Sequence, residues 1–435
     1  MTKKLYKEIF PYSEIPKIAF NNVQIPMDLP KEIWITDTTF RDGQQSMSSF
    51  TVEQIVRLYE YLHELDNGSG VIRQSEFFLY SDKDRKAVEE CMKKGFEFPE
   101  ITSWIRATKN DLQLVKNMGI KETGLLMSCS DYHIFDKLGS NREDVMRSYL
   151  DIAEDALSNG IKPRCHLEDI TRADFFGFVI PLVTELMKLS QKYGIQVKVR
   201  ACDTLGLGVP YNGVELPRSV PAIINGLRTH GGVPSEAIEW HGHNDFYSVV
   251  TNTTTSWLYG GSGANCALLG IGERTGNCPL EAMVFEYGQI TGTTKNMNLK
   301  VITDIAEYFQ KEMNYEIPQR TPFVGSEFNV TRAGIHADGI LKNEEIYNAF
   351  DTEKILNRPS IVAVNEYSGM AGIAAWVNGY FKLKDDAKID KRDPRIVPIK
   401  KWVDEQYESG RTTVIRNEEL KELADQYLFN IEESK

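Results

Sequence analysis

Cysteine is scarce in this chain, and its placement forms no metal-binding or disulfide pattern. The 435 residues include six cysteines, and none of them stands in a Cys-x-x-Cys spacing. Such a distribution indicates neither a thiolate zinc site nor a disulfide framework. We therefore expect free thiols and a reducing, cytoplasmic environment.

Long apolar runs and an excess of positive charge are also missing. No uncharged apolar segment reaches transmembrane length, and charges and prolines interrupt the apolar runs near the N-terminus. We therefore expect neither a signal peptide nor a membrane partner. The net charge of −12 argues against a nucleic-acid partner, because a phosphate backbone is bound by clustered basic residues. An anionic small substrate stays open, since a few arginines can make a local positive pocket.

The chain does contain a regular alternation of short β-rich runs and helical segments. The eight expected strands are 34–40, 71–78, 99–107, 122–128, 162–169, 196–205, 237–244 and 266–273. Between them, segments such as 51–65 and 142–159 place apolar residues at i, i+3, i+4 and i+7, as amphipathic helices do. Eight strand–helix units predict a closed TIM (β/α)8 barrel. An open doubly wound sheet is the alternative, but no Gly-x-Gly-x-x-Gly follows the first run.

Two segments are interpreted through the barrel pattern. Residues 251–257 (TNTTTSW) have the composition of a strand, because threonine is β-branched, but the alternation requires the helix after the seventh strand there. Residues 205–221 are rich in glycine and proline, and we expect them to form a long loop on the catalytic rim.

The alternation stops near residue 300, and this divides the chain. We expect an N-terminal extension over 1–30, the barrel over 31–300 and a smaller, mostly α-helical C-terminal subdomain over 301–435. The helices expected in the subdomain are 301–313, 344–356, 370–380 and 417–428.

Two histidines at the end of the expected seventh strand give the strongest local signal. His241 and His243 are two residues apart, so their side chains lie on the same face of a strand. Asp42 follows the first strand, which adjoins the eighth and so lies near the seventh. Two imidazoles and a carboxylate at the catalytic end of a barrel indicate a divalent metal site that also binds substrate. The alternatives are two structural histidines and a loop salt bridge.

Other strand ends carry polar residues with weaker signals. The eighth run leads into GIGERTGN at 270–277, the fifth ends in HLED at 166–169, and the sixth ends in DTLG at 203–206. Taken alone, each is compatible with a tight turn or a capped strand end.

Three motifs in order make a family resemblance specific. They are DTTFRDGQQ at 37–45, HGHND at 241–245 and GIGERTGN at 270–277. With them the chain resembles the family of 2-isopropylmalate, homocitrate and citramalate synthases, which also includes the citrate (Re)-synthases. The similarity extends through 128–138 (SCSDYHIFDKL) and into 334–342 (GIHADGILK).

The resemblance implies a metal site and two small-molecule substrates, a 2-oxo acid and acetyl-CoA. Asp42, His241 and His243 would hold the metal, with Asn277 in or near its shell. Mixed nitrogen and oxygen ligands favour Mn²⁺ or Co²⁺ and also admit Mg²⁺ or Zn²⁺.

The resemblance also implies catalytic and substrate-binding residues. Arg41 would stabilise the oxygen that becomes negative during carbon–carbon bond formation, and Gln45 and Thr204 would bind the oxo acid, Thr204 at its carboxylate. Glu168 and His336 would be the acid–base pair for the acetyl methyl group. His336 would come from the partner subunit of a homodimer with exchanged C-terminal subdomains.

The choice of oxo acid is expected to depend on charge. The family usually has glutamate where Gln44 stands, and the second strand here reads IRQSE at 72–76. Arg73 on that strand and Arg106 on the third would add donors where the far end of the substrate should lie. Such a pocket favours a dicarboxylic oxo acid, and the overall resemblance is greatest to citrate (Re)-synthases, which use oxaloacetate. An isopropyl group would instead need an apolar pocket.

Several alternatives stay open. Homocitrate, citramalate and 2-isopropylmalate synthases are other members of the family, although the chain leaves no room for the leucine-sensing domain that many 2-isopropylmalate synthases carry. Related hydroxymethylglutaryl lyases have a glycine–cysteine loop in place of GERTGN. Biotin-dependent carboxyltransferases also share the first motif, but no biotinyl Ala-Met-Lys-Met sequence occurs in this chain. A catalytically dead regulatory barrel is disfavoured because Asp42, His241, His243, Arg41 and Glu168 are all present.

Overall fold

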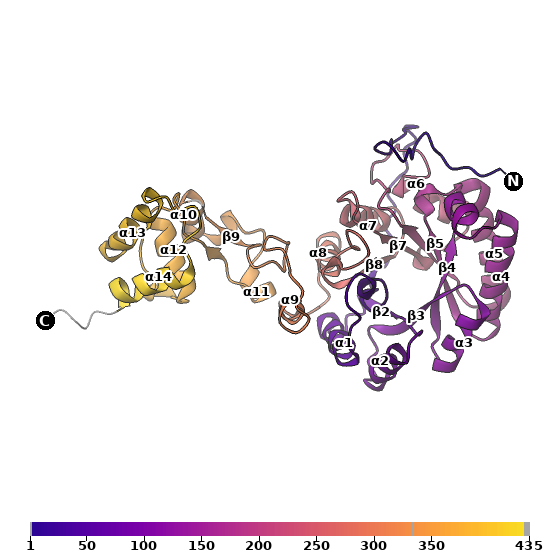
Figure 1. Cartoon of the computed structure of the whole chain (residues 1–435), viewed down its shortest axis with the longest axis horizontal. Helices are drawn as coiled ribbons and strands as arrows, with labels where there is room; N and C mark the ends of the chain where they lie inside the picture. The colour runs from indigo at the N-terminus through magenta and orange to yellow at the C-terminus, as the bar shows by residue number, and fades with distance from the viewer. Residues whose placement is uncertain (1, 333, 430–435) are drawn as a thin grey trace. The chain divides into compact units, whose positions relative to one another are not determined.

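The computed structural model describes residues 2–332 and 334–429. They form two compact units, with the boundary between Asn298 and Leu299. Indigo to pink ribbons in Figure 1 belong to the first unit, and orange to yellow ribbons belong to the second. In the described part of the chain, no helix is both long and apolar enough to cross a bilayer.

The first unit is a TIM barrel of eight parallel strands (Figure 1). The strands are β1 (Trp34–Asp37), β2 (Ile72–Phe77), β3 (Glu100–Arg106), β4 (Glu122–Ser128), β5 (Lys162–Glu168), β6 (Lys198–Asp203), β7 (Ile238–Gly242) and β8 (Gly263–Cys266). β1 pairs with both β2 and β8, which closes the sheet. The barrel predicted from the alternation is therefore confirmed.

One helix follows each strand. These helices are α1 (Val52–Asp66), α2 (Asp82–Lys93), α3 (Lys109–Met118), α4 (Arg142–Ser158), α5 (Ile180–Tyr193), α6 (Val220–Thr229), α7 (Val249–Leu258) and α8 (Leu280–Thr291). Thr51 and Ser81 form capping boxes at the starts of α1 and α2. Gly119 and Gly194 end α3 and α5 in the left-handed conformation, which glycine adopts without a steric penalty.

The threonine-rich segment 251–257 is helical, as the alternation requires. It lies inside α7, where the hydroxyl of Thr253 donates to the Val249 carbonyl at 2.7 Å and that of Thr255 donates to the Thr251 carbonyl at 2.7 Å. Tertiary context therefore outweighs the β propensity of threonine here.

The eighth strand lies earlier in the chain than expected. The expected strand was 266–273, whereas β8 ends at Cys266 and is followed by a 3₁₀ turn over Leu268–Gly270. β8 begins at Gly263, where a Cβ atom would lie 2.8 Å from Glu239 Cγ on β7. Gly263 is therefore a strand residue that makes room for a buried side chain.

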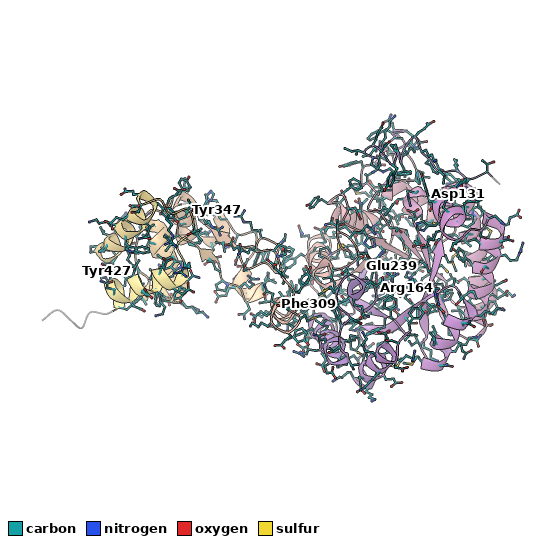
Figure 2. All side chains as sticks on the ribbon, viewed as in Figure 1. Asp131, Arg164, Glu239, Phe309, Tyr347 and Tyr427 are labelled. Carbon is teal, nitrogen blue, oxygen red and sulfur yellow. The ribbon has the colours of Figure 1, made fainter. Side chains whose placement is uncertain are left out.

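The interior of the barrel is filled with ion pairs as well as apolar groups. Arg164 donates to Glu76 at 2.8 Å and to Glu122 at 3.2 Å, and Arg200 donates to Glu76 at 3.0 Å. All four side chains are buried. Figure 2 shows Arg164 and Glu239 inside the ring of strands. Buried charges of this kind need partners, because an unpaired one is strongly destabilising.

The N-terminal segment runs along the rim of the barrel. Lys3 pairs with Asp136 at 2.6 Å in the connection after β4, and Arg218 donates to the Pro16 carbonyl at 3.0 Å. Arg218 belongs to the long connection between β6 and α6, which forms the loop expected over 205–221.

The second unit is mainly helical, as expected. Its helices are α9 (Val301–Glu312), α10 (Gly334–Lys342), α11 (Thr352–Leu356), α12 (Met370–Tyr380), α13 (Val397–Glu408) and α14 (Asn417–Ala424). The expected helix 344–356 is interrupted, because α11 starts only after Asp351, which caps its N-terminus. The second unit also contains a two-stranded parallel sheet that was not expected, formed by β9 (Val330–Thr331) and β10 (Ile361–Val362).

Candidate active site

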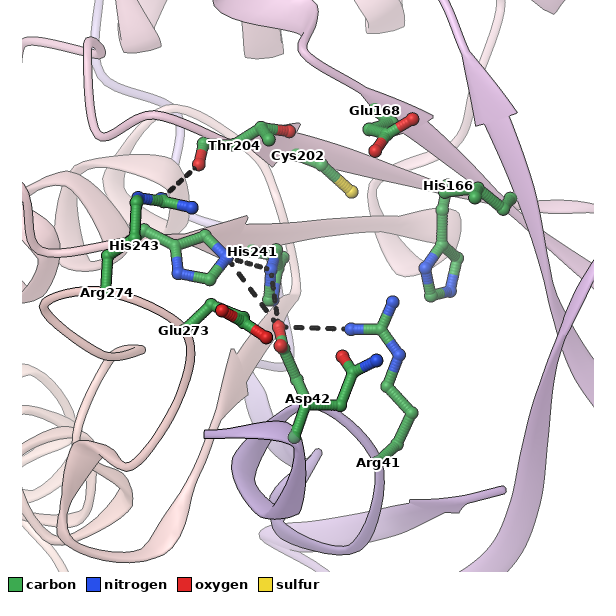
Figure 3. A pocket seen from close by; sticks show the side chains of 12 residues that line it. Arg41, Asp42, His166, Glu168, Cys202, Thr204, His241, His243, Glu273 and Arg274 are labelled. Carbon is green, nitrogen blue, oxygen red and sulfur yellow. Dashed lines mark hydrogen bonds and ion pairs between the residues drawn. The ribbon is translucent and has the colours of Figure 1, made fainter. Parts of the chain in front are cut away.

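A cavity of about 200 Å³ lies at the C-terminal ends of the barrel strands (Figure 3). Active sites of TIM barrels are found at this end. The lining residues are Arg41, Asp42, Gln45, Leu126, His166, Glu168, Cys202, Thr204, His241, His243, Glu273 and Arg274.

Asp42, His241 and His243 converge at one side of this cavity. The three residues are buried, and one possible ligand atom of each lies within 4.8 Å of the others. Asp42 Oδ2 is 3.3 Å from His241 Nε2 and 3.7 Å from His243 Nε2, and the two Nε2 atoms are 3.3 Å apart. Neighbouring ligands of an ion held at about 2.1 Å are separated by roughly 3–3.5 Å. The geometry therefore fits a divalent cation.

The protonation states of the cluster also suit a cation. Burial and the neighbouring His241 lower the pKa of His243 to about 4, so its ring is neutral near pH 7. Burial would raise the pKa of Asp42, but Arg41 and His241 hold it well below its usual range. Carboxylate oxygens and neutral imidazole nitrogens are ligand atoms that bind divalent metals.

A hydrogen-bond chain through the barrel orients His241. Its Nδ1 lies 2.8 Å from Asn265 Oδ1 on β8, and Asn265 Nδ2 donates to the Thr36 hydroxyl at 3.0 Å. Thr36 in turn donates to the Glu239 carboxylate. Because an amide oxygen only accepts, Nδ1 carries the hydrogen, and Nε2 keeps its lone pair toward Asp42.

Arg41 joins the cluster from the short helical turn η1 (Thr39–Gly43) that follows β1. One terminal nitrogen lies 3.0 Å from Asp42 Oδ2, and the guanidinium carbon lies 4.4 Å from the centre of the Trp104 ring. Glu76 Oε2 lies 3.8 Å from Arg41 Nε, and Arg200 on β6 donates to the same carboxylate. A fixed positive charge therefore stands beside the cation position.

Asn277 lies next to the cluster in the turn after β8. Its backbone forms a bridge with that of His243, and its Nδ2 donates to the Ile271 carbonyl at 2.9 Å. Its Oδ1 is buried and has no hydrogen-bond partner among the described residues. This oxygen is free to serve a ligand in or near the cluster.

Glu168, the last residue of β5, is held by three side chains. Ser128 donates to its carboxylate, Lys137 Nζ lies 2.8 Å from Oε2, and His133 Nδ1 lies 3.1 Å from the same oxygen. Burial would raise the pKa of Glu168, but His133 and Lys137 lower it to about 2. Glu168 is therefore a carboxylate at neutral pH.

The rim beside Thr204 is fixed by Arg274. Arg274 Nε lies 2.8 Å from Asp245 Oδ1, and its terminal nitrogen donates to the Thr204 carbonyl. The Thr204 hydroxyl accepts a hydrogen bond of 2.8 Å from the backbone N–H of Asp169, which leaves its own hydrogen free to donate. Gln45 also lines the cavity, and the residue is exposed.

Known proteins are similar to this chain in sequence and in fold. A family model described as HMGL-like matches residues 32–309, more than half of the chain. The chain belongs to the HMGL-like family. A Citrate (Re)-synthase of Clostridium kluyveri is 69% identical over 97% of this chain and 93% of its own length. A second, of Syntrophus aciditrophicus, is 52% identical over 98% and 67%. A 2-phosphinomethylmalate synthase of Streptomyces hygroscopicus is 39% identical over 97% and 95%.

Solved structures support the barrel of this HMGL-like chain. An HMG-CoA lyase of Bacillus subtilis aligns with a TM-score of 0.53 and 19% identity over 68% of this chain and 98% of its own. A hydroxymethylglutaryl-CoA lyase of Pseudomonas aeruginosa aligns with a TM-score of 0.52 and 17% identity over 66% and 95%. At these identities the likeness concerns the fold.

Neither arginine proposed for the far end of the substrate reaches the cavity. Arg73 is the second residue of β2, at the opposite end of the barrel, and its guanidinium stacks 4.2 Å above the ring of Trp34. Arg106 is at the correct end, but it is exposed and makes two contacts of 2.9 and 3.0 Å with Asp111 on α3. The expectation for Arg73 is corrected because Arg73 stands near the start of its strand, and only the C-terminal ends of the barrel strands reach the cavity. The expectation for Arg106 is corrected because its guanidinium is paired with the Asp111 carboxylate of α3 and does not line the cavity.

His336 lies in the second unit, on α10. Its side chain is exposed, and its ring centre is 4.4 Å from that of Tyr347. His336 belongs to the second unit and Glu168 to the first, so their pairing stays a prediction.

Several side chains in or near the cavity of this HMGL-like chain were not assigned from the sequence, among them His133, Lys137 and His166. His133 and Lys137 lie in the turn η2 (Tyr132–Lys137) after β4, inside the segment 128–138 that carried part of the family resemblance. His166 lies two residues before Glu168 on β5, and period-two alternation could have placed both on the same face.

Proposed function

We propose that this chain condenses acetyl-CoA with oxaloacetate and hydrolyses the resulting thioester, which gives citrate and free CoA. The observation that carries the proposal is that Asp42, His241, His243 and Arg41 meet in one barrel cavity. The chain is 69% identical, over nearly its whole length, to a protein named Citrate (Re)-synthase.

In this proposal Asp42, His241 and His243 hold a divalent metal ion, with the free Oδ1 of Asn277 close by. Bound there, the ion would act as a Lewis acid on the ketone of the oxo acid. The mixed nitrogen and oxygen donors favour Mn²⁺ or Co²⁺ and also admit Mg²⁺ or Zn²⁺.

Arg41 stabilises the ketone oxygen as it gains negative charge. Its guanidinium lines the cavity beside Asp42 and is held by the Trp104 ring and by Glu76. A preorganised cation in a buried site stabilises developing charge without having to reorient during the reaction.

Glu168 and His336 together remove a proton from the acetyl methyl group. A carboxylate whose pKa is about 2 is by itself a weak base, so Glu168 acts best by orienting an imidazole and stabilising its protonated form. We assign that imidazole to His336 of the partner subunit in a homodimer. The methyl carbon then attacks C2 of the oxo acid, and the ketone oxygen ends as a hydroxyl group.

Thr204 binds the carboxylate next to the ketone. Its hydroxyl accepts from the Asp169 N–H, so its hydrogen points away from that bond and can be donated to the substrate. Gln45, which lines the same cavity, would contact the same substrate. Water finally cleaves the thioester, and CoA leaves as the free thiol.

We also propose a cytoplasmic location. The six cysteines are all free and buried, which suits a reducing compartment.

The proposal is tested with a panel of 2-oxo acids. Metal-loaded protein and acetyl-CoA are mixed with oxaloacetate, 2-oxoglutarate, pyruvate or 2-oxoisovalerate, and thiol release is followed. We expect oxaloacetate to give the highest kcat/KM and a chelated sample to give none. A preference for 2-oxoisovalerate would contradict the dicarboxylate assignment.

A further inference from the structure

We propose that His166 selects the oxo acid by binding its second carboxylate, and that Gly124 makes the space in which the imidazole does so. This inference rests on the proposed condensation with a dicarboxylic oxo acid. In this role His166 takes the place of Arg73 and Arg106, which lie outside the cavity.

His166 stands on the wall of the cavity away from the metal cluster. Figure 3 shows its ring across the cavity from His243 and beside Arg41. It shares the inward face of β5 with Glu168, and only 2% of the residue is exposed. An oxo acid held at the metal cluster by its ketone end would extend its remaining carbon atoms toward this wall.

The Nε2 atom of His166 lacks a hydrogen-bond partner. It is buried and makes no hydrogen bond within the described ranges 2–332 and 334–429, and Glu76 Oε1 lies 3.5 Å from it. Buried polar side chains in native proteins usually have a partner, and an exception at a cavity wall points to a ligand.

The neighbouring strand is shaped to admit this ring. A Cβ atom on Gly124 of β4 would lie 2.6 Å from His166 Nε2 and 3.0 Å from Trp104 Cδ1. No side chain fits there while the imidazole keeps its position. The glycine is therefore explained by the placement of His166 and not by a turn.

The other possible donors in the cavity already have tasks. Arg41 faces Asp42, and Arg274 is held by Asp245 and the Thr204 carbonyl. Gln45 is an exposed lining residue, which the proposed function assigns to the same substrate. Leu126 and Cys202 offer no strong donor. On the wall away from Asp42, His241 and His243, His166 is a buried donor without a hydrogen-bond partner among the described residues.

The surroundings of His166 keep its imidazole neutral. Burial and the guanidinium groups of Arg200, Arg164 and Arg41 lower the pKa of His166 well below its ordinary value. A neutral imidazole still donates one N–H, which a carboxylate can accept and an alkyl group cannot.

The test compares His166→Leu and His166→Gln with the wild-type, Mn²⁺-loaded protein. Oxaloacetate and 2-oxobutyrate, which has the same chain length without the second carboxylate, are compared by kcat/KM with acetyl-CoA and by calorimetric binding without it. In His166→Leu we expect the ratio of oxaloacetate to 2-oxobutyrate to fall by at least about 100-fold. His166→Gln keeps an N–H donor and should recover part of the ratio. Metal content should stay at the wild-type level in both.

Matched controls separate this role from general damage. His230→Leu changes an exposed histidine and should keep the wild-type ratio. Gly124→Ala should lower the ratio as His166→Leu does, whereas Gly369→Ala, whose Cβ would meet nothing within 4 Å, should not.

Two results would overturn the inference in distinguishable ways. If His166→Leu loses binding and turnover of both oxo acids in equal proportion, His166 is a structural residue and the proposed function is untouched. If the wild-type protein releases no thiol with oxaloacetate, the proposed function fails and the inference fails with it.

Discussion

Asn265 controls which nitrogen of His241 faces Asp42 and His243. Its Oδ1 lies 2.8 Å from His241 Nδ1, and the side chain is fully buried. Replacing Asn265 with leucine should leave the imidazole free to flip or change tautomer, and we expect metal affinity to fall about 10–100-fold. Competitive metal titration measures this loss. Asn117→Leu, an exposed change on α3, is the control, and equal affinities in the two variants would contradict the role of Asn265.

The low pKa of Glu168 has a consequence for acid stability. Its pKa in the folded protein is about 2, below the ordinary value of 4.5, so the folded state favours the carboxylate. This stabilisation is fully present above about pH 4.5 and is lost as the pH falls toward 2. The difference in urea midpoint between wild type and Glu168→Gln should therefore shrink across this range. A difference that does not change with pH would contradict the assigned contacts with His133 and Lys137.

The convergence of Asp42, His241 and His243 could be predicted from residue order, and the opposite wall of the cavity could not. A two-residue spacing at a strand end places His241 and His243 on one face, and barrel closure brings Asp42 to them. The expectation for Arg73 was wrong because it was based on charge and not on position: Arg73 is near the start of its strand, and barrel active sites lie at the C-terminal ends. His166 was not assigned because the space for its imidazole depends on Gly124, which lies more than forty positions earlier in the chain.

At the level of elements, periodicity predicted the barrel better than composition did. The helix α7 was found despite its threonines because the alternation demanded it. β8 was placed too late because Gly263 serves the packing of Glu239, a contact between strands that no local pattern contains. In the second unit, β9 and β10 have two residues each, too few for a period to be read.

The N-terminal segment supports the turn η2, whose His133 and Lys137 hold Glu168. The Tyr132 hydroxyl donates to the Leu5 carbonyl. Removing the residues before Phe10 should loosen η2 and lower kcat about 10-fold while metal content stays constant, because small displacements of catalytic groups are costly. Hydrogen exchange at η2 and steady-state kinetics measure both effects. Unchanged exchange together with unchanged kcat would show that the segment is dispensable.

At the scale of the whole molecule, the proposed acid–base pair is divided between the two units. Glu168 belongs to the first and His336 to the second. If His336 comes from the partner subunit, inactive Glu168→Ala and His336→Ala dimers should form hybrids with one intact site each. Equal mixing should restore about a quarter of wild-type activity. No recovery after confirmed subunit exchange would contradict the shared site.

In the proposed function, this chain joins the acetyl methyl carbon to oxaloacetate at a metal site formed by Asp42, His241 and His243. The most direct measurement uses acetyl-CoA labelled with ¹³C at the methyl carbon, oxaloacetate and Mn²⁺-loaded protein, with the product followed by ¹³C NMR. We predict a citrate methylene signal that grows in step with thiol release and is absent from metal-free protein and from His243→Ala. Citrate formation at an undiminished rate by rigorously metal-free protein, or thiol release without labelled citrate, would contradict the account.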